Sequence, residues 1–126
     1  MDIRELRIGN NVHFDGYDDC IVEGIGLDTV IINTYDVIDE VFISQLKPIE
    51  LTEDWLIYRF GFEKELDGSY FKNDISIFLD KRLKTNLYLY SDRKFEWFGY
   101  GCKINYIHQL QNLYFALTGN ELCLNK

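Results

Sequence analysis

The side chains that could carry out chemistry in this 126-residue chain gather in three groups. The first is acidic: Asp15, Asp18, Asp19, Asp36, Asp39 and Glu40. The second mixes basic and aromatic side chains: Lys81, Arg82, Lys84, Tyr88, Tyr90, Arg93, Lys94 and Trp97. The third lies on one face of a predicted C-terminal helix: His108, Gln111, Asn112 and Phe115. Each group suggests a different kind of ligand.

The acidic group does not have the spacing of a metal site. Asp15, Asp18 and Asp19 lack the D-x-[DN]-x-[DN]-G pattern of a calcium loop, and no glutamate follows where it would close such a loop. We predict two solvated acidic loops, at residues 15–19 and 36–40, and no metal or other cofactor. A surface this negative suits the basic groove of a protein that binds nucleic acid, because opposite charges steer association.

The basic and aromatic group has the composition of a surface for single-stranded nucleic acid, with cations for phosphates and rings for stacking on bases. The net charge argues against that function. The chain has 21 acidic and 13 basic residues, a net charge of −8, and residues 1–66 alone carry −10. Such a charge repels a polyanion over a Debye length of about 8 Å and beyond. Nucleic acid is therefore not the predicted partner, and binding through residues 81–97 is kept as an alternative.

Few residues are suited to catalysis. His13 and His108 are the only histidines, and neither belongs to a nucleophile elbow or to a metal-binding histidine pair. Both are predicted to face solvent. The cysteines Cys20, Cys102 and Cys123 form no C-x-x-C pair, so neither a disulfide framework nor a zinc site is predicted. No residue is assigned a catalytic role, and a non-enzymatic protein is expected.

The composition favours an α+β protein. Aromatic residues make up 16% of the chain, and β-branched residues are abundant while alanine occurs once. In residues 1–50, short apolar runs at 11–14, 20–25, 29–33 and 41–43 are separated by turn residues, which predicts four or five antiparallel strands. This order resembles an SH3-like β-barrel of the KOW or Tudor type.

Residues 51–61 are predicted to form a short linker helix. Thr52 is a good N-cap, and Gly61 follows the last turn as a C-terminal cap.

Residues 62–126 are predicted to form an antiparallel meander and a final helix. Asp67-Gly68 marks one hairpin, strands are expected at 75–79, 87–90, 94–98 and 102–105, and Gly119 ends a helix over residues 106–118. The apolar stripe of this helix is predicted to cover the meander, leaving the polar face and Phe115 exposed.

Two sequence stretches carry a resemblance: YIHQLQNLYFALTGNEL at residues 106–122 and PIELTEDWL at residues 48–56. With them the chain resembles a family of small uncharacterised proteins of Bacteroidetes-type bacteria and their phages or mobile elements. The resemblance implies a bacterial or phage setting and a role in conflict between phage and host. It carries over no catalytic residue.

The function expected from these observations is binding to a protein partner, either through the acidic surface or through an aromatic and polar surface around Phe115 and Trp97. That second surface consists of Tyr88, Tyr90, Trp97, His108, Gln111, Asn112 and Phe115. Inhibition of a host defence or nucleic-acid-binding complex is one form of this binding, and a homo-oligomer is another explanation for exposed aromatic residues. The alternative is a small-ligand binder or enzyme with a pocket between the two halves, in which His108, Gln111 and Asn112 or the tyrosines supply the polar groups. No apolar run is long enough to cross a membrane and no apolar leader precedes the first strand, so a cytoplasmic location is expected.

Overall fold

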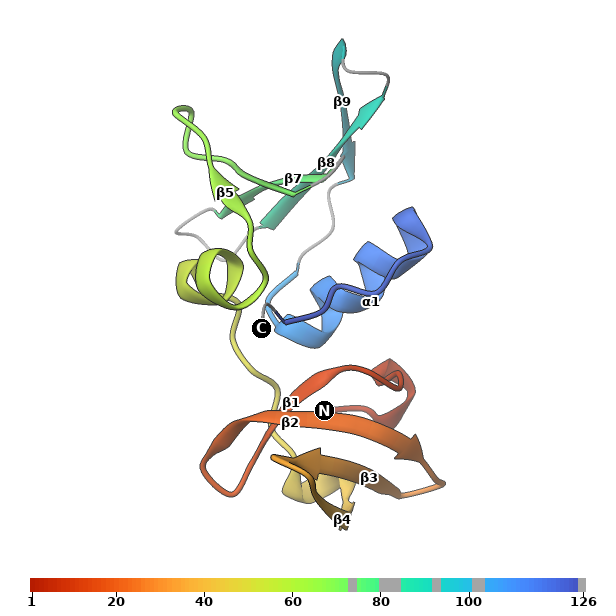
Figure 1. The fold of residues 1–126 in the computed structure, drawn as a ribbon. Coiled ribbons are helices and arrows are strands. Elements are labelled where there is room, and N and C mark those ends of the chain that lie inside the picture. Colours follow the sequence, from red (N-terminus) through yellow and green to blue (C-terminus); the bar gives the residue numbers. More distant parts are fainter. Residues whose placement is uncertain (73–74, 80–84, 92–93, 101–103, 125–126) are drawn as a thin grey trace. The chain divides into compact units, whose positions relative to one another are not determined.

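The computed structural model describes residues 1–72, 75–79, 85–91, 94–100 and 104–124, with backbone alone for residues 78–79, 85–91 and 94–100. The fold is α+β, as predicted (Figure 1). The described residues form two antiparallel sheets, one main helix and three short helical turns. The chain forms two compact units. Unit 1 comprises residues 1–50 and 106–121, and unit 2 comprises residues 51–105 and 122–126.

The sheet of unit 1 contains four consecutive strands in the order β1-β2-β3-β4. They are β1 (Asn11–Phe14), β2 (Tyr17–Ile25), β3 (Thr29–Thr34) and β4 (Val37–Phe42). The predicted strands are confirmed, although β2 begins three residues earlier and β4 four residues earlier than expected. The register of β2 against β3 shifts between Val22 and Gly24, which marks a β-bulge at this point of the sheet.

Two-residue turns close the first and third hairpins of this sheet. Asp15 and Gly16 connect β1 to β2, with φ of 49° and 85°. Tyr35 and Asp36 connect β3 to β4, with φ of 50° and 68°. Positive φ at both central positions is the geometry of a type I′ turn, whose twist matches that of the flanking strands. The second turn therefore sets the register of β3 against β4 along the whole hairpin, whereas the register of β1 against β2 shifts between Val12 and Phe14.

The core of unit 1 lies on one face of the sheet and consists of aliphatic side chains at alternate strand positions. Val22 on β2, Val30 and Ile32 on β3, and Val41 on β4 are buried in it. A short 3₁₀ turn, η1 (Ile3–Glu5), precedes β1, and Leu6 and Cys20 join the same cluster. Cys20 thus behaves as a small hydrophobic residue, whereas Cys123 is exposed.

The sheet does not close into a barrel. After β4 the chain makes a second 3₁₀ turn, η2 (Ile43–Gln45), and then runs beside β1. His13 and Lys47 exchange two backbone hydrogen bonds there, each 2.9 Å long. This single bridge places the segment after η2 next to β1, on the side away from β2.

The predicted linker helix exists in unit 2 as a short π-helical segment, η3 (Trp55–Arg59). The Phe60 amide donates to the Trp55 carbonyl 2.9 Å away, which is the wider i→i−5 spacing. Thr52 caps the start of the segment, and Gly61 has φ of 76°, as expected of a C-terminal cap.

Unit 2 contains a five-stranded antiparallel meander in the order β5-β6-β7-β8-β9. The strands are β5 (Glu63–Lys64), β6 (Tyr70–Lys72), β7 (Ile75–Leu79), β8 (Thr85–Ser91) and β9 (Lys94–Tyr100). The hairpin predicted at Asp67-Gly68 is confirmed, and the Asp67 carboxylate accepts hydrogen bonds from the amide and hydroxyl of Ser69. The strand predicted at 102–105 falls largely outside the described residues, and Ile104 and Asn105 are not in a strand.

The final helix, α1 (Ile107–Thr118), is confirmed, with Gly119 at φ of 74° as its cap. The helix belongs to unit 1, where it packs beside β1, and so the C-terminal segment 62–126 is not a single unit. Residues 106–121 belong to unit 1 because the chain pairs again with the end of its first segment at Tyr106. Tyr106 forms a β-bridge with Glu50, and the Ile107 amide donates a hydrogen bond to the Ile49 carbonyl.

We expect Ile32→Ala to lower the free energy of unfolding of unit 1 by about 2 to 5 kcal/mol, because it leaves a cavity among fully buried aliphatic side chains. Ile31→Ala is the matched control, since Ile31 lies on the opposite, exposed face of the same strand. Urea denaturation followed by far-UV circular dichroism measures both variants. Equal effects of the two changes would contradict the placement of the core.

Candidate functional site

The predicted acidic loops are wrong in part, because most of their residues lie on strands. Asp18 and Asp19 lie on β2, and Asp39 and Glu40 lie on β4. Only Asp15 and Asp36 lie in turns. The turns are two residues long, which leaves the neighbouring carboxylates in the extended strands. Strand geometry then divides the acidic side chains between the two faces of the sheet.

An open pocket of about 250 Å³ lies at the end of the sheet where the two turns meet. We call it the aromatic–acidic pocket, and it is lined by Phe14, Asp15, Tyr17, Thr34, Tyr35, Val37 and Asp39. No basic side chain lines it. Its volume is below the roughly 300–1,000 Å³ of pockets for small organic ligands, so it suits a single side chain of a larger partner.

The walls of this pocket are two exposed tyrosines held in a defined geometry. The rings of Tyr17 and Tyr35 meet edge to face, with centroids 6.1 Å apart and planes at 81°. The Tyr35 hydroxyl donates a hydrogen bond to the Asp19 carboxylate. Both tyrosines are more than half exposed. Tyr35 lies in the second turn and has a positive φ, as the two-residue turn requires. Such a backbone conformation costs a non-glycine residue about 1 to 2 kcal/mol.

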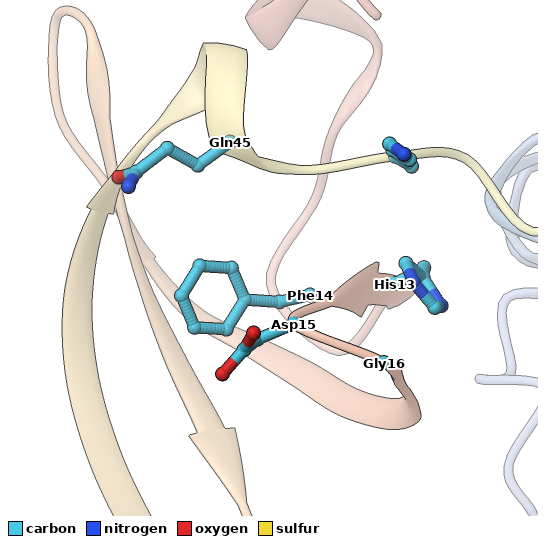
Figure 2. Close-up of a pocket in the computed structure, with 6 residues that line it drawn as sticks. His13, Phe14, Asp15, Gly16 and Gln45 are labelled. Carbon is cyan, nitrogen blue, oxygen red and sulfur yellow. The ribbon is translucent and has the colours of Figure 1, made fainter.

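A second, larger pocket of about 510 Å³ is shown in Figure 2. It shares Phe14 and Asp15 with the aromatic–acidic pocket and is also lined by His13, Gly16, Gln45 and Lys47. The His13 Nδ1 atom lies 2.5 Å from the Asp18 Oδ1 atom, which orients the ring. An oriented histidine could act as a base, but the pocket contains no serine, threonine or cysteine to serve as a nucleophile.

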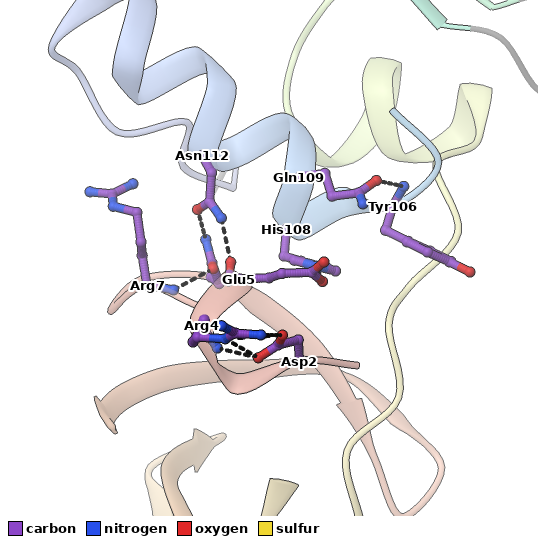
Figure 3. A network of polar contacts seen from close by, with 9 residues as sticks. Asp2, Arg4, Glu5, Arg7, Tyr106, His108, Gln109 and Asn112 are labelled. Carbon is purple, nitrogen blue, oxygen red and sulfur yellow. Dashed lines mark hydrogen bonds and ion pairs between the residues drawn. The ribbon is translucent and has the colours of Figure 1, made fainter. Parts of the chain in front are cut away.

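Gln111 and Asn112, predicted to be exposed polar groups, instead hold α1 to the N-terminal segment of unit 1. The Gln111 carbonyl oxygen accepts the Asn11 backbone amide at 2.8 Å, and the Gln111 amide donates to the Asn11 side chain at 2.9 Å. Asn112 accepts from the Asn10 side chain and donates to the Glu5 carbonyl (Figure 3). Gln111 is fully buried. We call these contacts the polar clamp.

His108 is also buried rather than exposed, with 1% of its surface accessible. Its ring stacks on the Tyr106 ring, with centroids 5.9 Å apart, and its Nε2 atom lies 3.5 Å from the Glu5 carboxylate. Burial lowers the pKa of His108 below its ordinary value, and the nearby Glu5 carboxylate opposes that shift only in part. His108 is therefore part of the packing between α1 and η1.

Phe115 is partly exposed, as predicted, but one face of its ring is occupied. The Arg7 guanidinium lies 3.8 Å from the ring centroid, and the same arginine forms an ion pair with Glu121 at 2.8 Å. This cation–π contact explains an aromatic residue on the polar face of α1 without any partner molecule.

The basic and aromatic group cannot be assembled into a site from the described residues. Tyr88 and Tyr90 lie on β8 and Lys94 and Trp97 on β9, where the backbone alone is described. Lys81, Arg82, Lys84 and Arg93 lie outside the described residues. Binding through this segment stays a prediction.

The residues that sequence reasoning missed are Phe14, Tyr17 and Tyr35. The sequence marks the Asp15-Gly16 turn by its glycine, but the Tyr35-Asp36 turn contains no glycine and carries no comparable signal. Residues that flank the two turns line one pocket.

Comparison with protein-family models, with curated proteins and with solved structures found no match to this chain. Within the described ranges, no group of three histidine, cysteine, aspartate or glutamate side chains is arranged to hold a metal ion. No helix in the same ranges has the length and apolar character needed to cross a bilayer.

The buried position of His108 leads to a pH dependence. A histidine whose pKa falls on folding stabilises the native state above its unfolded pKa, 6.5, and this contribution is lost as pH falls through the lower, folded pKa. We expect the unfolding free energy to fall below pH 6.5 and the imidazole resonances of His108 to titrate below that value in an NMR experiment. His108→Gln should reduce the loss of stability. An His108 pKa above 6.5 would contradict this.

Proposed function

We propose that this chain is a non-enzymatic binding protein that engages a basic segment of a partner protein through the aromatic–acidic pocket. The observation that supports it best is the edge-to-face pair of Tyr17 and Tyr35 beside the carboxylates of Asp15 and Asp39. Aromatic faces and carboxylates both attract a lysine or arginine side chain. A pocket with this lining has no comparable attraction for an anion or a neutral ligand.

The charge of unit 1 supports the same partner class. Unit 1 contains twelve acidic and three basic side chains, a net charge of −9, whereas unit 2 carries +1. The acidic character of the chain thus belongs almost entirely to the unit that contains the pocket. A field of this sign accelerates encounter with a basic protein and repels nucleic acid. Basic proteins that themselves bind nucleic acid are the natural partners for such a unit, in line with the phage or mobile-element setting that the sequence resemblance implies.

The SH3-like interpretation of unit 1 is part of this proposal. Four antiparallel strands in sequential order are followed by the 3₁₀ turn η2 and by a segment that pairs with β1 at His13 and Lys47. That order of elements is the one expected of an SH3-like barrel, although only one bridge joins the last segment to the sheet. Barrels of this kind commonly place their binding residues in the loops at one end.

The polar groups of α1 give less support to the alternative of a small-ligand site or an enzyme. Gln111 and Asn112 form the hydrogen bonds of the polar clamp. His108 stacks on Tyr106 and lies beside the Glu5 carboxylate. These contacts hold α1 in place within unit 1. We therefore place the binding function at the opposite end of the sheet, in the two turns.

The binding proposal predicts that unit 1 distinguishes a basic from an acidic peptide. We expect the peptide SVTKRVS to bind the protein, its charge-reversed counterpart SVTEEVS not to bind, and added salt to weaken the complex. Fluorescence anisotropy with labelled peptides measures each dissociation constant. Equal binding of the two peptides would overturn the proposal.

The tyrosine walls of the pocket are tested by Tyr35→Asn, since asparagine accepts a positive φ at this turn and lacks the ring. Loss of the cation–π contact should weaken binding of the basic peptide about tenfold. Tyr58→Asn, at a tyrosine of unit 2 with comparable exposure, is the matched control and should leave binding unchanged. An unaffected Tyr35→Asn variant would place the basic peptide elsewhere.

A further inference from the structure

The strand β4 forms one edge of the sheet of unit 1, and no other strand among those that the structure describes pairs with its outer side. All of its residues except Val41 are exposed. Its pairing with β3 is regular over six residue pairs, without a bulge. Proteins usually protect such edges with proline, with charged side chains, above all lysine, with a bulge or with a covering segment. β4 has no proline, lysine or bulge, and its two charged residues, Asp39 and Glu40, are both acidic. These charges repel another acidic strand and leave the edge open to a basic one.

The backbone groups that face outward can be assigned from the register. Val37 pairs with Thr34 across the two-residue turn. The pair that closes such a turn exchanges both backbone hydrogen bonds, and bonded and non-bonded pairs alternate from there along an antiparallel ladder. The backbones of Val37, Asp39 and Val41 therefore bond to β3. The N–H and C=O groups of Ile38 and Glu40 point away from the sheet.

The hydrogen bond of Phe42 agrees with this assignment. By the same alternation, Phe42 and Thr29 form a pair without backbone hydrogen bonds between them, so the Phe42 amide also points outward. The Phe42 amide donates to the Gln45 side-chain oxygen at 2.9 Å instead of to β3. One outward amide is thus already satisfied within unit 1, and the outward groups of Ile38 and Glu40 form the open part of the edge.

The side chains of β4 divide between two faces. Val37 and Asp39 lie on the side of the aromatic–acidic pocket, which they help to line. Ile38, Glu40 and Phe42 lie on the opposite, exposed face. A strand added to this edge would therefore direct every second side chain toward the aromatic–acidic pocket. Its other side chains would lie beside Ile38, Glu40 and Phe42 on the opposite face.

We propose that β4 is a docking edge at which an extended, basic segment of the partner protein adds a fifth strand to the sheet. This inference rests on the proposed function and specifies its binding mode. Main-chain hydrogen bonds to Ile38 and Glu40 hold the segment, a basic side chain opposite Asp39 reaches the aromatic–acidic pocket, and a second one lies opposite Glu40. Apolar side chains of the segment cover Ile38 and Phe42.

The charge of the edge selects this occupant over a second copy of the chain. Antiparallel pairing of two β4 strands centred on Asp39 or Glu40 brings carboxylates directly opposite one another. Like charges at opposed positions destabilise a strand pair, whereas opposite charges stabilise it. The two acidic residues thus disfavour self-association and favour a basic strand.

Backbone methylation of the peptide tests strand addition separately from charge attraction. In SVTKRVS, only alternate amides can point toward the edge, so N-methylation of one alternating set should weaken binding about tenfold or more, and N-methylation of the other set should leave it nearly unchanged. Both methylated peptides keep the charge and side chains of the parent. Equal effects of the two sets would overturn strand addition.

A variant of the protein gives the complementary test. Ile38→Pro removes an outward amide that the β3 ladder does not use, and proline is tolerated on edge strands when its nitrogen faces outward. Ile38→Thr keeps the amide and the β-branched shape and is the matched control. We expect Ile38→Pro to weaken binding about tenfold relative to Ile38→Thr, with circular dichroism confirming that both variants fold.

Amide hydrogen exchange distinguishes the failure of this inference from the failure of the proposed function. The Ile38 and Glu40 amides should exchange fast in the free protein and become protected when SVTKRVS binds. If the peptide binds and depends on Tyr35 but these amides stay unprotected and Ile38→Pro binds normally, strand addition is wrong and the pocket proposal stands. If no basic peptide binds the wild-type protein, both are overturned.

Discussion

The register of the two hairpins in unit 1 is the constraint on which the rest of this structure depends. The two-residue turn at Tyr35 and Asp36 sets the pairing of β3 with β4 over all six residue pairs. The turn at Asp15 and Gly16 sets the pairing of Phe14 with Tyr17, and the register of β1 against β2 shifts between Val12 and Phe14. Because side chains alternate between faces, a slip of one residue along β4 would bring Glu40 or Phe42 to the place of the buried Val41. The same register brings Tyr17 and Tyr35 together and turns the backbone of Ile38 outward. The composition of the core, the lining of the pocket and the orientation of the edge all depend on the register of the strands.

The general architecture could be predicted because it depends on local patterns. Alternating β-branched residues between turn residues identified the strands of unit 1, and the Asp67-Gly68 pair identified a hairpin of unit 2. Helix caps at Thr52 and Gly119 were equally local signals. Local patterns could not predict whether the sheet closes into a barrel, because closure depends on contacts between distant segments, such as the His13–Lys47 bridge.

The candidate site was harder to predict, for two physical reasons. A hydrophobic stripe predicts the buried face of a helix only when its neighbour is apolar, and α1 meets a segment that offers backbone groups and the asparagines Asn10 and Asn11. A glutamine and a histidine were buried as a result. The pocket forms because two turns lie at the same end of the sheet, and local sequence patterns do not predict which turns share an end. The acidic residues could therefore be predicted as a group, but the aromatic residues beside them could not.

The placement of α1 has a consequence for the way this protein is made. Unit 1 is discontinuous: fifty-five residues of unit 2 are inserted between Glu50 and Tyr106, two residues that pair with each other. During synthesis, at about 5 to 20 residues per second, the completed sheet emerges from the ribosome several seconds before the helix that binds its first strand. Asn10 and Asn11 stay hydrated until Gln111 and Asn112 emerge. The nascent chain thus carries a vacant helix-binding surface for that interval.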